Sequence, residues 1–160
     1  MNKKILVIVA HPDDEILGVG GTILKHAAEG DEVSALILGD GVLSRSTATR
    51  ADIKEREKQA EQVSKKLGFK NLFLEKLPDN QFDSVSLLSI AKIVEKYIDK
   101  IKPDIGYTHH SGDLNIDHNE LVDARWVKKG EIAAVLQGAE DFGFTLPPKI
   151  AIARTLLEYW

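Results

Sequence analysis

The sequence contains no cysteine, so disulfide bonds and zinc sites built on thiolates are both excluded. Any metal bound by this chain must therefore use histidine, aspartate or glutamate side chains. No run of residues approaches the ~20 apolar residues that span a bilayer. The short apolar run after Lys3 and Lys4 ends in His-Pro-Asp-Asp, which is unlike a signal peptide. We therefore expect a cytoplasmic protein without a membrane span.

Blocks of lysine and arginine are also missing, and the formal net charge is −4. Nothing in the composition therefore favours nucleic acid as a partner. The 160 residues are 43% hydrophobic and 29% charged, an ordinary balance for a globular chain. This length suits one domain with a packed core, so we expect a single domain over residues 1–160. Its last part, from about residue 120, has an unclear pattern of strands and helices.

Apolar patterns predict an alternation of strands and helices along the chain. The predicted strands are residues 4–10, 33–38, 71–75 and 105–108. The predicted helices are residues 16–27, 50–67 and 86–101, with further helices at 119–129 and 131–139. Glycines at 30 and 68 are expected to end the first two helices.

This alternation predicts the α/β class, with a Rossmann-like parallel sheet between two layers of helices. We expect the strand order 3-2-1-4, plus a further strand in the tail. In that order the first and fourth strands are neighbours, so their carboxyl ends meet at one edge of the sheet. Polar clusters that follow these two strands are therefore predicted to lie together.

The first cluster is Ala10-His11-Pro12-Asp13-Asp14-Glu15, between the first strand and the first helix. Pro12 suits the first turn of a helix, and strand-to-helix turns are the usual place for ligands in α/β sheets. One imidazole and two carboxylates at this point favour a functional site. The alternative is that Asp13 and Asp14 only cap the helix, and that His11 is a hydrogen-bonded core residue.

The second cluster follows the fourth strand and has the sequence His109-His110-Ser111-Gly112-Asp113-Leu114-Asn115-Ile116-Asp117-His118. Four of the five histidines of the chain fall in these two clusters, which favours a shared site. The alternatives are that His109 and His110 are partly exposed and idle, and that Asp113 forms a turn. For Asp117 we favour a role as the cap of the following helix.

Two histidines and one carboxylate form a ligand set typical of catalytic zinc, with one position left for water. We expect His11, Asp14 and His118 to be the ligands, and iron is compatible with the same donors. Zinc lowers the pKa of its bound water toward ~7. Asp13 is the candidate general base that takes a proton from this water.

Attack on an amide carbonyl creates an oxyanion, which needs a hydrogen-bond donor besides the metal. His109, His110 or Asn115 is expected to supply that donor. His110, as an imidazolium, is also a candidate to protonate the leaving amine.

Residues 10–15 resemble the hallmark Ala-His-Pro-Asp-Asp-Glu of the LmbE-like family, the superfamily of N-acetylglucosaminyl-phosphatidylinositol de-N-acetylase. The segment from Tyr107 to His118, a strand and a turn ending in Asp-His, is similar to the second hallmark of this family. The resemblance covers about residues 3–120. It implies that His11, Asp14 and His118 bind zinc and that Asp13 is the general base.

The resemblance also implies that Arg56, early in the second helix, and Asp79, after the third strand, hold the substrate or the oxyanion. Without it, Arg56 would be a solvated helix residue and Asp79 a turn former. Asn115 departs from the family, because many members have a histidine there, and this transfers oxyanion stabilisation to His110. The residues after about 120 depart as well.

We expect a zinc-dependent N-deacetylase that acts on an N-acetylated amino sugar or glycoconjugate and releases acetate and a free amine. A homo-oligomer is left open. One alternative is a truncated, engineered or catalytically incomplete scaffold that keeps the metal site. Another is a non-catalytic nucleotide- or phosphate-binding module, although Gly18-Val19-Gly20-Gly21 is not the Gly-x-Gly-x-x-Gly fingerprint and lies within a predicted helix.

Overall fold

A computed structural model describes residues 2–110, 112–123 and 133–134. Strands and helices alternate along the chain as the sequence predicts. The strands are β1 (Lys4–Val9), β2 (Glu32–Gly39), β3 (Asn71–Leu77), β4 (Ile105–Tyr107) and β5 (Ala133–Ala134). The helices are α1 (Asp14–Ala28), α2 (Arg50–Leu67), the 3-10 turn η1 (Phe82–Ser84), α3 (Leu87–Ile101) and α4 (Ile116–Asp123).

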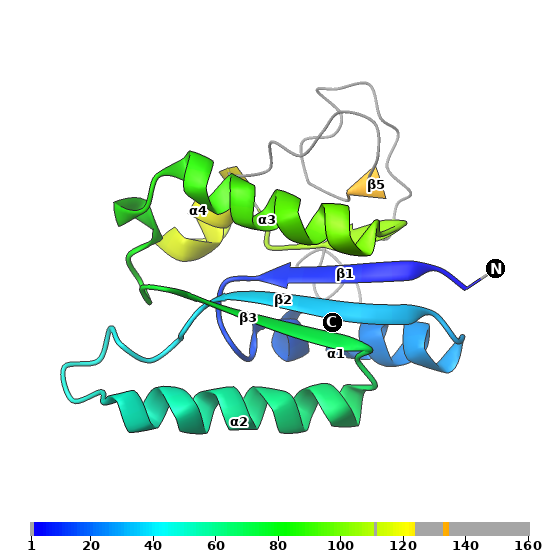
Figure 1. Cartoon of the computed structure of the whole chain (residues 1–160), viewed down its shortest axis with the longest axis horizontal. Helices are drawn as coiled ribbons and strands as arrows, with labels where there is room; N and C mark the ends of the chain where they lie inside the picture. The colour runs from blue at the N-terminus through cyan, green and yellow to red at the C-terminus, as the bar shows by residue number, and fades with distance from the viewer. Residues whose placement is uncertain (1, 111, 124–132, 135–160) are drawn as a thin grey trace.

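The strands form one parallel sheet in the order β3-β2-β1-β4-β5 (Figure 1). β1 lies between β2 and β4, with Ile5 opposite Val33 on one side and Ile105 on the other. The predicted class and the order 3-2-1-4 are therefore confirmed. This order places the segments after β1 and β4 next to each other at the carboxyl edge of the sheet.

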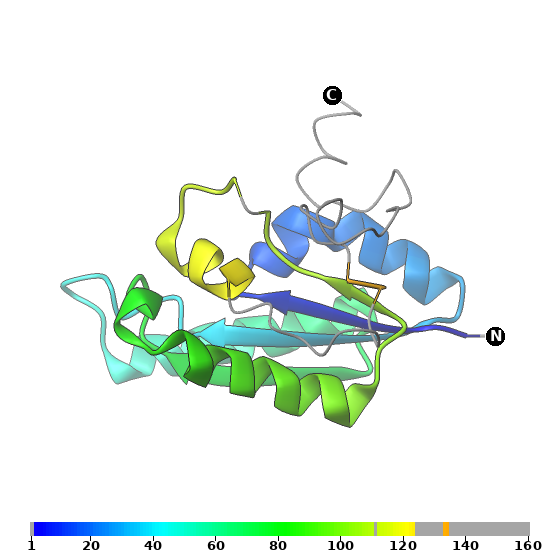
Figure 2. The ribbon, with the colours of Figure 1, turned by 90° about the horizontal axis from the view of Figure 1, so that it is seen from above.

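The helices cover both faces of the sheet, because successive side chains of each strand point to opposite faces. Ile5, Val7 and Val9 of β1 pack in a cluster with residues of α1 and α2. Leu6 and Ile8 of the same strand pack in the other cluster, with residues of α3 and α4. Figure 2 shows the sheet between α1 and α3. Both faces of β1 are thus buried, which explains its unbroken apolar run.

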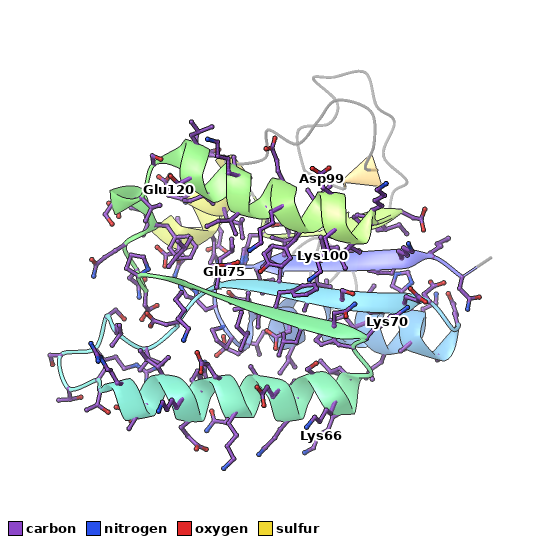
Figure 3. The ribbon with its side chains drawn as sticks, in the orientation of Figure 1. Lys66, Lys70, Glu75, Asp99, Lys100 and Glu120 are labelled. Carbon is purple, nitrogen blue, oxygen red and sulfur yellow. The ribbon has the colours of Figure 1, made fainter. Side chains whose placement is uncertain are left out.

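β3 and α3 are also joined by polar contacts at the sheet surface. The Tyr97 hydroxyl donates a hydrogen bond of 2.6 Å to Oε1 of Glu75, and Lys96 Nζ donates to the same oxygen at 3.2 Å. Lys100 places its Nζ 4.5 Å from the centre of the Phe73 ring. Figure 3 shows Glu75 and Lys100 where α3 crosses the sheet.

Local signals set the ends of α2. The Thr49 side chain accepts a hydrogen bond from Asp52 N while Asp52 accepts one from Thr49 N, a reciprocal capping box. The helix ends at Gly68, whose φ of 76° lies in the left-handed region that glycine adopts without cost. None of the described helices is both long enough and apolar enough to cross a membrane.

The predicted helix over residues 131–139 is wrong where the structure describes it, because Ala133 and Ala134 pair with β4 as β5. Alanine favours helices, but the backbone groups at the edge of β4 need partners, and this pairing overrides the local preference. α4 begins at Ile116, earlier than predicted. The rest of the two predicted tail helices, residues 124–129, 131–132 and 135–139, lies outside the described residues.

Candidate metal centre

The turn between β1 and α1 lies at the carboxyl edge of the sheet (Figure 1). Asp13 has φ 127° and ψ −24°, a conformation that residues other than glycine rarely adopt. Its side chain makes no capping hydrogen bond with α1, so the interpretation of Asp13 as a helix cap is wrong. Backbone strain of this kind concentrates at functional sites.

Gly41, just after β2, packs directly against this turn. Its φ is +65°, and a Cβ atom added there would lie 2.8 Å from Cδ of Pro12. Pro12 stands between His11 and Asp13 in the chain. Only a glycine at position 41 therefore lets β2 end this close to the turn without displacing it.

His11, Asp14 and His118 converge although more than a hundred residues separate the first from the last. Oδ2 of Asp14 lies 3.5 Å from Nδ1 of His11 and 3.3 Å from Nε2 of His118. One donor atom from each of the three lies within 4.8 Å of the other two. The two distant turns are thus within coordinating reach of one common point.

The donor set fits a divalent cation such as zinc. Two imidazoles and one carboxylate are the ligand types of open, catalytic zinc sites. Nε2 of His118 is buried and has no hydrogen-bond partner, which is costly for a polar atom unless something binds there. Nδ1 of His11 and Oδ2 of Asp14 face the same point, so these three atoms are the candidate ligands.

Two other groups at the centre also bring donor atoms together, and each shares one histidine with the first group. They are His109, Asp113 and His118, and His11, Asp79 and Asp117. In the second of these, both oxygens of Asp117 already accept backbone hydrogen bonds. These carboxylates therefore serve better as hydrogen-bond partners of the histidines than as ligands.

Asp117 is completely buried and does not cap α4, contrary to the sequence-based expectation. Its Oδ2 lies 2.8 Å from Nε2 of His11 and accepts a hydrogen bond from Asn80 N, and its Oδ1 accepts one from Phe82 N. The cap is Asn115, whose Oδ1 accepts from the backbone N of Asp117 and of His118. Asn and Asp are equally good caps, so position alone could not tell which of the two does this.

Asp113 forms the expected turn, since its Oδ1 accepts a hydrogen bond from Asn115 N. Its other oxygen lies 2.9 Å from Nδ1 of His118. The sequence did not predict the contact between Asp113 and His118, because it depends on how the first turn of α4 packs against the loop before it. The side-chain oxygen of Asn115 accepts the two hydrogen bonds that cap α4. Of the Asn115 side chain, only the amide N–H groups are therefore left as donors to an oxyanion.

His109 lies against His118, with ring centroids 3.7 Å apart and planes 12° from parallel. Its Nε2 accepts a hydrogen bond of 2.9 Å from Ala10 N. This nitrogen is therefore not the oxyanion donor considered for His109. The ring instead supports one side of His118 and ties β4 to the end of β1.

Charges at the centre are strongly coupled. Burial opposes a charge on His11, but hydrogen bonds with Asp14 and Asp117 outweigh it and raise the pKa of His11 to about 9. Burial likewise opposes the charge on Asp14, yet contacts with His11 and His118 hold its pKa well below the ordinary range. Burial lowers the pKa of His109 to about 4, and the nearby His118 adds to this effect. Asp14 thus stays ionised and draws positive charge toward itself, as a cation site requires.

Asp13 is paired with Arg56 of α2. Nη2 of Arg56 donates a hydrogen bond of 2.6 Å to Oδ2 of Asp13, and Nε of Arg56 is buried without a hydrogen-bond partner. Arg56 is therefore not the solvated helix residue that the sequence pattern alone indicated. It is held against the turn between β1 and α1 through Asp13.

Asp79 is also drawn into the centre. It is 5% exposed, its Oδ1 lies 3.3 Å from Nε2 of His11, and its Oδ2 accepts hydrogen bonds from the backbone N and the hydroxyl of Ser44. Asp79 thus links the loop after β2 to His11. Its role is more than that of a turn former.

Within the described residues, the side chain of His110 makes no hydrogen bond or ion pair with another expected site residue. Its Nδ1 accepts a hydrogen bond of 2.9 Å from Gly112 N. This bond places the proton of the neutral ring on Nε2, which leaves Nε2–H as a donor.

Residues 6–126 match the family described as PIG-L, GlcNAc-PI de-N-acetylase. The match covers most of the chain and includes every candidate residue above. The chain belongs to this family. The family expected from residues 10–15 and 107–118 is therefore confirmed.

Relatives of known name support the assignment to the GlcNAc-PI de-N-acetylase family. The probable N-acetyl-alpha-D-glucosaminyl L-malate deacetylase 2 of Bacillus anthracis is 24% identical over 129 residues, which cover 76% of this chain and 57% of that protein. The N,N'-diacetylchitobiose deacetylase from Pyrococcus horikoshii matches with a TM-score of 0.66 at 26% identity, over 76% of this chain and 49% of that one. The conserved protein TT1542 from Thermus thermophilus matches with a TM-score of 0.66 at 25% identity, over 84% of this chain and 64% of that one. The chain thus spans between about half and two thirds of these family members.

Proposed function

We propose that the chain is a zinc-dependent N-deacetylase that acts on an N-acetylated amino sugar or glycoconjugate. The observation that carries the proposal is the convergence of His11 Nδ1, Asp14 Oδ2 and His118 Nε2, in a turn that also contains Asp13. Membership of a de-N-acetylase family and the names of two relatives, both deacetylases of acetylated sugar compounds, support the same reaction.

His11, Asp14 and His118 would hold the metal. Zinc in such a site supplies a Lewis acid that polarises an acyl carbonyl and lowers the pKa of a water molecule. Iron(II) suits the same donors, and metal analysis of the purified protein decides between the two.

Asp13 is the proposed general base. Its carboxylate takes a proton from the attacking water and returns it to the nitrogen of the sugar as the C–N bond breaks, so that acetate and a free amine leave. Arg56 holds the carboxylate in place through its 2.6 Å hydrogen bond, and its other guanidinium N–H groups are the proposed donors to a substrate oxygen. Asp79 fixes the loop that carries Ser44 at the edge of the site.

Stabilisation of the oxyanion is assigned to Nε2–H of His110, since its Nδ1 is already an acceptor. The Asn115 oxygen caps α4, so that side chain contributes its N–H groups at most.

The test is acetate release from N-acetylglucosamine derivatives, with zinc present and after removal of zinc by a chelator. Asp13→Asn keeps the shape and an acceptor for Arg56 but removes the base, so we expect the rate to fall by about 10²–10⁴-fold with zinc content unchanged. Asp83→Ala, at an exposed aspartate of η1, is the matched control and should leave the rate unchanged. A rate for Asp13→Asn within about twofold of the natural chain contradicts the proposed base, since general-base catalysis is worth far more.

The alternative hypothesis is a catalytically incomplete scaffold that keeps the metal site. It predicts bound zinc without acetate release from any acetylated sugar, and that result would contradict the deacetylase proposal. The alternative of a phosphate-binding module is not supported, because Gly18, Gly20 and Gly21 lie inside α1 rather than in a loop before a helix.

A further inference from the structure

The two histidines of the centre face Asp14 with different ring nitrogens. His11 presents Nδ1, and His118 presents Nε2. A neutral imidazole binds a metal only through the nitrogen that carries no proton. Each ring must therefore keep its proton on the opposite nitrogen, which is Nε2 in His11 and Nδ1 in His118.

Asp117 fixes the proton of His11. Its carboxylate accepts two backbone hydrogen bonds, of 2.7 Å from Asn80 N and of 2.9 Å from Phe82 N. An ionised carboxylate only accepts hydrogen bonds, so Nε2 of His11, 2.8 Å away, must carry the proton. Asp79 lies further from this nitrogen, at 3.3 Å.

Asp113 does the same for His118 from the opposite side. Its Oδ2 lies 2.9 Å from Nδ1 of His118, while its Oδ1 is held by Asn115 N. The proton of His118 is thus kept on Nδ1. Nε2, the buried atom without a partner, is left free.

We propose that Asp117 and Asp113 are positioning residues, each of which fixes the tautomer of one of the two metal-holding histidines. The inference rests on the ligand assignment made above. Each carboxylate contacts a histidine that must bind through a defined nitrogen, and neither touches the reacting atoms. Their loss should weaken metal binding, because the neighbouring ring can then protonate the nitrogen that the metal needs.

The experiment measures zinc affinity by competition with a chromophoric chelator, on the purified full chain and on Asp117→Asn and Asp113→Asn. An amide can donate as well as accept, and so can stabilise the wrong tautomer. We expect the zinc dissociation constant to rise by about 10- to 100-fold in each variant. The Asp117 side chain is fully buried, so Asp117→Asn can prevent folding. The Asp113 side chain is 37% exposed, so Asp113→Asn is expected to fold and still tests the inference at His118.

Asp31→Asn is the matched control, because Asp31 makes the same kind of contact with a histidine outside the centre. Its Oδ2 lies 2.7 Å from Nδ1 of His26. This variant also disrupts the only candidate cation group away from the centre among the described residues, His26, Glu29 and Asp31. Zinc affinity equal to that of the natural chain is expected.

A second readout separates positioning from general loss of structure. Nitrogen-15 NMR of the zinc-loaded natural chain should show the imidazole proton on Nε2 of His11 and on Nδ1 of His118. The opposite tautomers, or unchanged affinity in folded Asp117→Asn and Asp113→Asn, would overturn the inference whatever the activity. Weakened affinity in a chain that releases no acetate leaves the inference standing and overturns the proposed function. Failure of the natural chain to bind zinc overturns both.

Discussion

Gly41→Ala should lower the stability of the fold and disturb the candidate metal centre at the same time. Alanine at φ +65° costs about 1–2 kcal/mol, because its Cβ crowds the backbone in the left-handed region. The new Cβ also lies 2.8 Å from Cδ of Pro12, whereas carbon atoms prefer about 3.5–4.0 Å. Overlap of this kind adds about 1–3 kcal/mol. The free energy of unfolding should therefore fall by about 2–5 kcal/mol in total.

Gly68→Ala is the matched comparison, since Gly68 has φ +76° and the nearest atom to an added Cβ is 3.6 Å away, an ordinary contact. It should lose only the backbone contribution, about 1–2 kcal/mol. Urea unfolding of both variants measures the difference, and chelator competition measures zinc affinity. Because Pro12 joins His11 to Asp13, only Gly41→Ala should also bind zinc more weakly. Equal losses of stability in the two variants, with zinc affinity intact in both, would refute this reasoning.

Three further perturbations test the fold away from Gly41. Phe82→Ala removes a fully buried ring from the core and should lower the free energy of unfolding by about 3–5 kcal/mol in chemical denaturation. Thr49→Ala breaks the capping box with Asp52 and should cost about 0.5–2 kcal/mol, with faster amide hydrogen exchange in the first turn of α2 as the local readout; unchanged exchange there would count against the cap. The hydrogen bond from Tyr97 lowers the pKa of Glu75 in the folded chain below its ordinary value of 4.5. The contact therefore stabilises the fold above the pKa that Glu75 has in the unfolded chain, and this stabilisation is lost as the pH falls through the lower pKa of the folded chain. Glu75→Gln should therefore reduce the loss of stability between about pH 7 and about pH 3, and an unchanged loss would contradict the assignment.

The architecture was largely predictable because it follows from patterns that repeat along the chain. A strand buried on both faces, such as β1, appears as an unbroken apolar run, and glycine at position 68 marks a helix end. Once the strands alternate with helices, the connection rules restrict the order to a few possibilities. The meeting of His11 and His118 follows from that order rather than from any local signal.

The partners of the two histidines were not predictable by the same route. Asp113 and Asp117 were interpreted as turn and cap residues, because local sequence favours both roles for aspartate. Their contacts with His118 and His11 depend on how α4 lies against the sheet and η1, and packing at that level leaves no periodic trace in the sequence. The residues of the short strand β5 were assigned to a helix for a related reason, since only the edge of β4 gives Ala133 and Ala134 a reason to extend.

The strand order also has a consequence for the time at which the centre can form during synthesis. Its first two donors leave the ribosome early, and the last follows only after β2, α2, β3 and α3 have been made. Until β4 inserts beside β1, only one imidazole and one carboxylate of the proposed ligand set are present, too few for tight binding of a cation. If His11, Asp14 and His118 hold a metal as proposed, we therefore expect it to bind only after β4 has joined the sheet.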